Sequence, residues 1–160
     1  MTVNPYERRL GCGAIVQNQS GEVLLVRRRG ATPGEPSSWA LPVVEAEAWE
    51  TSRQAAVRAV HKRAALVVDP EELAFALEWR EDGPARGRAV WMLIFYRASA
   101  RGAVIDHRRD PEVLEVRWIP PEGAKMLVGT GALGAALAEW LASGMAASYE
   151  IPPGEEARPV

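Results

Sequence analysis

The sequence predicts an α/β fold in which a mixed sheet lies between helices. Short apolar runs separated by turn-forming residues indicate strands. Residues 50–66 contain good helix formers and neither glycine nor proline, which indicates a helix. A second helical pattern lies near the carboxyl end, so the elements run in the order strands, helix, strands, helix.

The first strands are predicted between residues 11 and 30. The apolar stretches Ala14–Val16 and Val23–Val26 are separated by "QNQSG", a cluster of turn formers. The following segment "ATPGEPSS" is rich in proline, glycine and serine and is predicted to be a loop. Residues 39–44, "WALPVV", form a short strand candidate, and Pro42 confines its pairing to a sheet edge or a strand end.

The central helix is predicted over "ETSRQAAVRAVHKRAAL". Its apolar residues Ala56, Val60 and Ala64 recur at four-residue spacing, which places them on one face. Thr51 or Ser52 is expected to cap the amino end, because a hydroxyl there accepts a hydrogen bond from a free backbone N–H.

The second half of the chain is predicted to hold further strands and one helix. "DPEE" (69–72) is expected to break the chain, and an antiparallel pair follows at 73–80 and 88–99. Residues 112–120 are predicted to form a strand, which two prolines terminate.

The carboxyl-terminal helix is predicted over residues 131–144, where "GALGAALAEWLASG" has an apolar face. We therefore expect one domain over residues 1–144 and a flexible, proline-rich tail over residues 145–160.

Composition excludes several classes of protein. The chain has 160 residues and a formal net charge of −2, so neither a nucleic acid nor a membrane surface is expected as a partner. The longest apolar run, Ala89–Tyr96, is far shorter than the ~20 residues of a membrane helix. Cys12 is the only cysteine, and the amino end lacks the apolar core of a secretory signal. These features favour a cytoplasmic location.

Several blocks of residues together resemble the Nudix superfamily over roughly residues 10–143. They are "GEVLLVRRR", "WALP" before the helix, the helix itself, "EVRWIP" and the late amphipathic helix. The signature of the family is G-x5-E-x7-R-E-U-x-E-E-x-G-U, where U is a bulky aliphatic residue. When it is aligned from Val44, agreement occurs at Glu50, Arg58, Val60 and Leu66. The resemblance implies a Nudix-like α/β/α sandwich.

The same resemblance implies a metal-dependent hydrolase that cleaves a diphosphate linked to another moiety, but its acidic residues are missing. The family's metal-binding glutamates fall at Ala59, Lys62 and Arg63, which share an arc of roughly 100° on a helix. Two cations there would repel a divalent ion. No metal is therefore expected, and Mg²⁺ is expected only if carboxylates from outside the helix bind it. The resemblance also implies that Glu50 and Arg58 form the pair that ties the loop to the helix in the family.

A binding protein is the first of three hypotheses. Lys62 and Arg63 would pair with the phosphate or carboxylate oxygens of a nucleotide-like small molecule, and Arg29 would border the same cleft. A solvated helix face explains Lys62 and Arg63 equally well. Three tryptophans are candidates for an aromatic lining, although core packing also explains each of them: Trp49, Trp79 and Trp91.

Two enzymatic alternatives stay open. One is a Nudix hydrolase, acting on nucleoside diphosphate-linked substrates, whose metal ligands come from glutamates elsewhere in the chain. The other is a metal-independent enzyme of small-molecule biosynthesis that reuses the cleft. The candidate catalytic residues for these alternatives are Glu47, Glu50 and His107. The resemblance also implies a homodimer.

Overall fold

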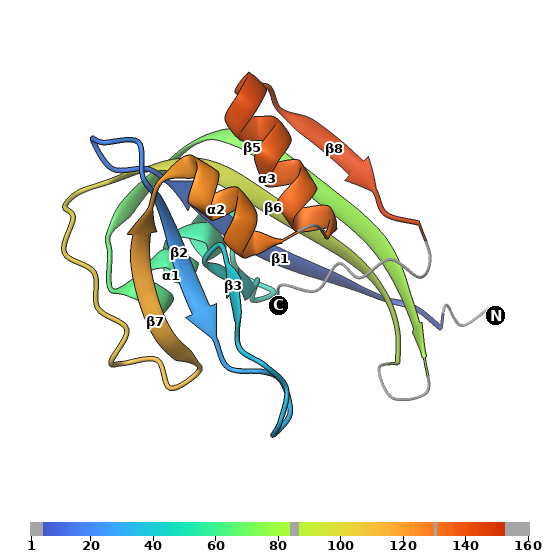
Figure 1. The fold of residues 1–160 in the computed structure, drawn as a ribbon. Coiled ribbons are helices and arrows are strands. Elements are labelled where there is room, and N and C mark those ends of the chain that lie inside the picture. The colour runs from blue at the N-terminus through green and yellow to red at the C-terminus, as the bar shows by residue number, and fades with distance from the viewer. Residues whose placement is uncertain (1–4, 84–86, 130, 153–160) are drawn as a thin grey trace.

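The computed structural model describes residues 5–83, 87–129 and 131–152. These residues form eight strands and three helices (Figure 1). In chain order the elements are β1 (Glu7–Val16), β2 (Val23–Arg28), β3 (Ser38–Ala40), β4 (Val43–Glu45), α1 (Ser52–Ala64), β5 (Val68–Gly83), β6 (Gly87–Ala100), β7 (Val113–Ile119), α2 (Pro121–Val128), α3 (Ala132–Ser143) and β8 (Ala147–Glu150). The predicted α/β class is confirmed.

The strands of the described residues form two sheets. The larger has five strands in the order β4-β1-β6-β5-β8 and is mixed, because β1 runs parallel to β6 and β5 parallel to β8, whereas the other neighbours are antiparallel. The smaller sheet is antiparallel and has the order β3-β2-β7. The sequence predicted one mixed sheet, and the smaller antiparallel sheet was not predicted.

Helices cover the two sides of these sheets. In Figure 1, α3 lies in front of the larger sheet and α1 lies behind it, while α2 lies beside α3 and contacts β2 and β3 of the smaller sheet. Successive side chains of β1 point to opposite faces of the sheet, so this strand contributes to the core on both faces. Ile15 lies in the core cluster that contains the buried residues of α2 and α3, whereas Ala14 and Val16 lie in the cluster that contains Val60 of α1.

Strand β1 closely approaches the chain just before β4, and this contact positions β4. A Cβ atom at Gly13 would lie 2.3 Å from the carbonyl oxygen of Pro42, so only glycine fits there. Cys12 then pairs with Val44, and Gly13 pairs with Val43. Strand β4 is thereby held beside α1.

Three predicted elements differ from the structure. Residues 39–44 form parts of two strands, β3 and β4, which belong to different sheets. Residues 69–72 do not break the chain but lie within β5, where the pairing register shifts between Pro70 and Leu73. Such an irregularity accommodates a residue that has no N–H to donate. Helix α2 was missed, although proline is well tolerated in the first turn of a helix.

The predicted flexible tail is wrong for its first part. Strand β8 pairs in parallel with β5, Ile151 is buried, and its backbone N–H donates to the carbonyl oxygen of Glu78. The domain therefore extends past its predicted end at residue 144. The tail residues 153–160 lie outside the described residues, as do residues 84–86 of the segment 81–87 that connects the predicted antiparallel pair. No helix in the described ranges is long and apolar enough to span a bilayer.

Candidate functional site

The amino end of α1 is held by two hydrogen-bonded pairs. Thr51 is the N-cap, as the sequence allowed: its hydroxyl accepts from the backbone N–H of Gln54, and the Gln54 side chain accepts from the backbone N–H of Thr51. Arg58 donates from Nε and Nη2 to the two carboxylate oxygens of Glu50, both at 2.8 Å. The same guanidinium donates to the carbonyl oxygen of Glu45, so α1, its preceding loop and β4 are joined.

Glu50 is placed as a structural residue by these contacts. Its side chain is 2% exposed, and it also accepts a hydrogen bond from the backbone N–H of Glu47. The guanidinium of Arg58 lowers the pKa of the Glu50 carboxyl below its ordinary value. Both oxygens are therefore occupied, and the group stays ionised at neutral pH.

The three helix positions aligned with the signature's glutamates have three different environments. Ala59 is fully buried in a cluster with Cys12 and Val44. Lys62 is exposed, and within the described part of the chain its ammonium makes no ion pair. Arg63 is only 4% exposed. The residues that were predicted to share one anion site are thus divided between the core and the surface.

Arg63 is surrounded by oxygen atoms of the protein itself. Its Nη1 lies 2.8 Å from Asp110 Oδ2 and 2.8 Å from Glu112 Oε2, and Nε and Nη2 both lie 3.4 Å from the carbonyl oxygen of Val43. The Asp110 side chain is 1% exposed, whereas that of Glu112 is 57% exposed. The pair joins α1 to the segment between β6 and β7.

A second guanidinium completes this cluster. Arg28 Nη2 donates to the same Glu112 oxygen at 3.1 Å. The hydrogen bond from Arg63, assisted by Arg28, lowers the pKa of the Glu112 carboxyl, while burial and the nearby Arg63 lower the pKa of Arg28. Two cations and two carboxylates make the cluster formally neutral. The donors of Arg63 face protein oxygens, and the structure does not present them to a ligand.

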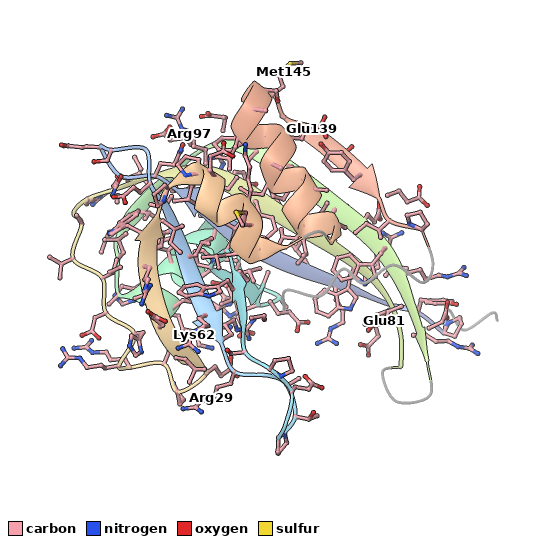
Figure 2. All side chains as sticks on the ribbon, in the orientation of Figure 1. Arg29, Lys62, Glu81, Arg97, Glu139 and Met145 are labelled. Carbon is pink, nitrogen blue, oxygen red and sulfur yellow. The ribbon has the colours of Figure 1, made fainter. Side chains whose placement is uncertain are left out.

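Arg29 lies beside the same segment but faces solvent. Its backbone N–H donates to the carbonyl oxygen of Glu112, and its Nε donates to that of Pro111. Figure 2 labels Arg29 and Lys62 on the side of the molecule where β2 ends and β7 begins. Of the three cations predicted to bind a ligand, Arg29 and Lys62 are exposed and Arg63 is buried.

The three tryptophans predicted to line a ligand site are not equivalent. Trp79 and Trp91 are buried and stack on each other, with ring centroids 5.9 Å apart and an angle of 8° between planes. The guanidinium of Arg9 lies 4.5 Å from the centroid of Trp91. Arg9 is held by a two-point ion pair with Glu45 at 2.8 and 2.6 Å. Trp91 is therefore covered by protein groups, whereas Trp49 is 76% exposed.

The remaining catalytic candidates lie apart in the chain. Glu47 is exposed in the loop before α1. His107 is half-buried in the segment before β7, and its carbonyl oxygen accepts from the backbone N–H of Asp110. Sequence reasoning missed Asp110 and Arg9 altogether. The only signal for Asp110 was an acid directly before Pro111, and nothing in that pattern connects it to a helix 47 residues earlier.

The donors on α1 do not fit a magnesium ion. Hard divalent cations require several oxygen ligands, and this face presents a methyl group, an ammonium and a guanidinium. Across residues 5–83, 87–129 and 131–152, no group of three or more His, Cys, Asp or Glu side chains is arranged to hold a metal.

Comparisons with known proteins identify a family model and solved structures that are similar to this chain. A model of the NUDIX domain matches residues 7–140. Similar solved structures include a MutT protein from Methanosarcina mazei Go1 (16% identity, 89% of this chain and 99% of that chain, TM-score 0.70) and a NUDIX hydrolase from Nitrosomonas europaea (21%, 94% and 82%, 0.69). An ADP-ribose pyrophosphatase from Streptococcus suis is also similar (16%, 91% and 100%, 0.61). A search of curated proteins gave no match. At these identities the solved structures show a common fold.

Proposed function

The chain belongs to the NUDIX domain family, and from this membership we propose that it binds a phosphorylated, nucleotide-like or other anionic small molecule without magnesium-dependent cleavage of a diphosphate. The observation that carries the proposal is the sign of the charge on α1. Where the family's signature has three glutamates, this chain has a buried methyl group and two cations, Lys62 and Arg63.

Ligand chemistry explains why this exchange opposes hydrolysis. An ammonium and a protonated guanidinium have no lone pair for a metal, and their charge repels a dication. Asp110 and Glu112 do bring carboxylates close to α1, which is what a hydrolase with relocated ligands would need. Both, however, already bind the guanidinium of Arg63. A metal would have to displace a buried cation that belongs to the protein.

Anion binding requires donors that a ligand can reach. Lys62 and Arg29 are exposed, and ammonium and guanidinium groups form strong charge-assisted hydrogen bonds with phosphate oxygens. Trp49 is the exposed aromatic residue next to Glu50 and is available to contact a planar part of the ligand. These three residues are our candidates for direct contact, and Trp79, Trp91 and Arg63 are assigned a supporting role by their burial.

Calorimetric titration with ADP-ribose tests the proposal, since a similar structure is an ADP-ribose pyrophosphatase. We expect binding in buffer that contains EDTA. Lys62→Glu should weaken binding about tenfold or more, which corresponds to about 1.4 kcal/mol. Lys125→Glu on α2 is the matched control, because it changes the net charge equally at the only other lysine of the chain. Equal effects of the two substitutions would contradict a site at Lys62, and a lack of binding to any diphosphate-linked nucleotide would contradict the proposal.

The metal-independent enzyme remains an alternative prediction. It depends on His107 and Glu47, and within the described ranges neither side chain forms a hydrogen bond or an ion pair. The predicted homodimer and cytoplasmic location also stay predictions.

A further inference from the structure

We propose that the guanidinium of Arg63 is a built-in cation, which fills an oxygen-lined cation site formed by Asp110, Glu112 and the carbonyl group of Val43. Two carboxylate oxygens from separate side chains lie at the same distance, 2.8 Å, from one atom, Arg63 Nη1. The carbonyl oxygen of Val43 faces the other side of the guanidinium at 3.4 Å. Oxygen atoms from three residues thus converge on one buried positive group.

Burial shows that the Arg63–Asp110 pair is internal, whereas the Glu112 side chain, which is 57% exposed, lies at the solvent edge of the site. The side chains of Arg63 and Asp110 are 4% and 1% exposed. A charge in such a place is tolerated only when it is paired and hydrogen-bonded. The contacts also join α1, β4 and the segment before β7, elements that are distant in the sequence. A bound metal ion commonly joins chain segments in this way, and here a side chain does so.

The net charge of the Arg63 cluster predicts how a variant would respond to a metal ion. Arg63 and Arg28 carry two positive charges, and Asp110 and Glu112 carry two negative charges, so the native cluster is formally neutral. Replacing Arg63 with glutamate would leave three carboxylates and one guanidinium. The cluster would then carry two negative charges, which a single dication would neutralise. Three carboxylates and a backbone carbonyl are also the oxygen ligands that Mn²⁺ and Mg²⁺ accept.

Thermal unfolding of the Arg63→Glu variant with and without Mn²⁺ tests the inference. We expect 10 mM Mn²⁺ to raise the melting temperature of the variant by about 5 °C or more, and EDTA to reverse the change. The native protein should show no comparable rise. Adding Asp110→Asn to Arg63→Glu is the matched control, which should abolish most of the response because it removes one of the converging oxygens and one charge. An equal Mn²⁺ response in the native protein and the variant would overturn the proposal.

A second variant keeps the test decisive if Arg63→Glu does not fold. Arg63→Gln removes the positive charge without adding a negative one, so its Mn²⁺ response should lie between those of the native protein and a folded acidic variant. If Arg63→Gln also lacks any response, the proposal fails. None of these measurements uses an organic ligand, so their outcome is separate from that of the proposed function. Binding of ADP-ribose could fail while the cation response succeeds, or the reverse.

Discussion

Removal of the positive charge at Arg63 without replacement should destabilise the protein strongly. In Arg63→Met, the Asp110 carboxylate would keep its 1% exposure but lose its closest cation. Breaking a buried ion pair by removing one partner costs about 3–5 kcal/mol. We expect about 3 kcal/mol, the lower end of that range, because Glu112 is 57% exposed and Arg28 remains close. For a chain of this length that loss lowers the melting temperature by about 6–12 °C.

Urea unfolding followed by tryptophan fluorescence measures this loss, since the chain has six tryptophans. Arg101→Met is the control, because its ion pair with Asp69 joins two largely exposed side chains and should contribute nothing measurable. The double variant Arg63→Met with Asp110→Asn should recover part of the loss, because no lone buried charge remains. The reasoning is refuted if Arg63→Met unfolds at the same urea concentration as Arg101→Met, or if the double variant is less stable than Arg63→Met alone.

Three further predictions concern α1 and its neighbours. Ala65 ends α1 with a φ of 56°, a conformation that glycine adopts more easily, so Ala65→Gly should stabilise the protein by about 1 kcal/mol in urea unfolding, and a loss of stability would contradict this. The folded-state pKa of Glu50 is lowered by Arg58, so its contribution to stability is present above about pH 4.5 and is lost as the pH falls through the folded value. The stability difference between the native protein and Glu50→Gln should therefore shrink on acidification, and a constant difference from pH 7 to pH 3 would refute that assignment. Burial raises the pKa of the Cys12 thiol to about 11, so a thiol reagent at pH 8 should react slowly with folded protein and fast in urea; equal rates would show that Cys12 is accessible.

Local patterns were sufficient to predict much of the fold. Residues 52–64 are a helix because they have the composition, the apolar spacing and the cap that a helix requires, and all three are visible in a short window of sequence. Strand β8 and helix α2 were missed because their stability depends on distant partners. The four residues of β8 pair with β5, and Ile151 is buried in the core cluster that also contains Leu77 and Trp79 of β5.

The candidate site was harder to predict than the fold. The alignment with the signature puts Ala59, Lys62 and Arg63 at its acidic positions, and it treated Lys62 and Arg63 alike. The structure separates them because Asp110 and Glu112, which lie more than forty residues away in the chain, pair with only one of the two. Side-chain partners across such a distance leave no local pattern. For the same reason the sequence could not distinguish Trp79 of β5 and Trp91 of β6 from tryptophans that contact a ligand. Their mutual stacking and the contact of Trp91 with Arg9 join residues that are distant in the sequence.

The most direct test of the account is a turnover measurement with the diphosphate probe of the binding experiment. The native protein would be incubated with the probe and excess Mg²⁺ or Mn²⁺, and the products would be separated by chromatography. If cationic groups have replaced the metal ligands on α1, the bound probe should be recovered intact with either metal ion. Metal-dependent cleavage at the diphosphate, which is lost in Asp110→Asn and Glu112→Gln, would contradict the account and would favour a hydrolase whose ligands come from outside the helix.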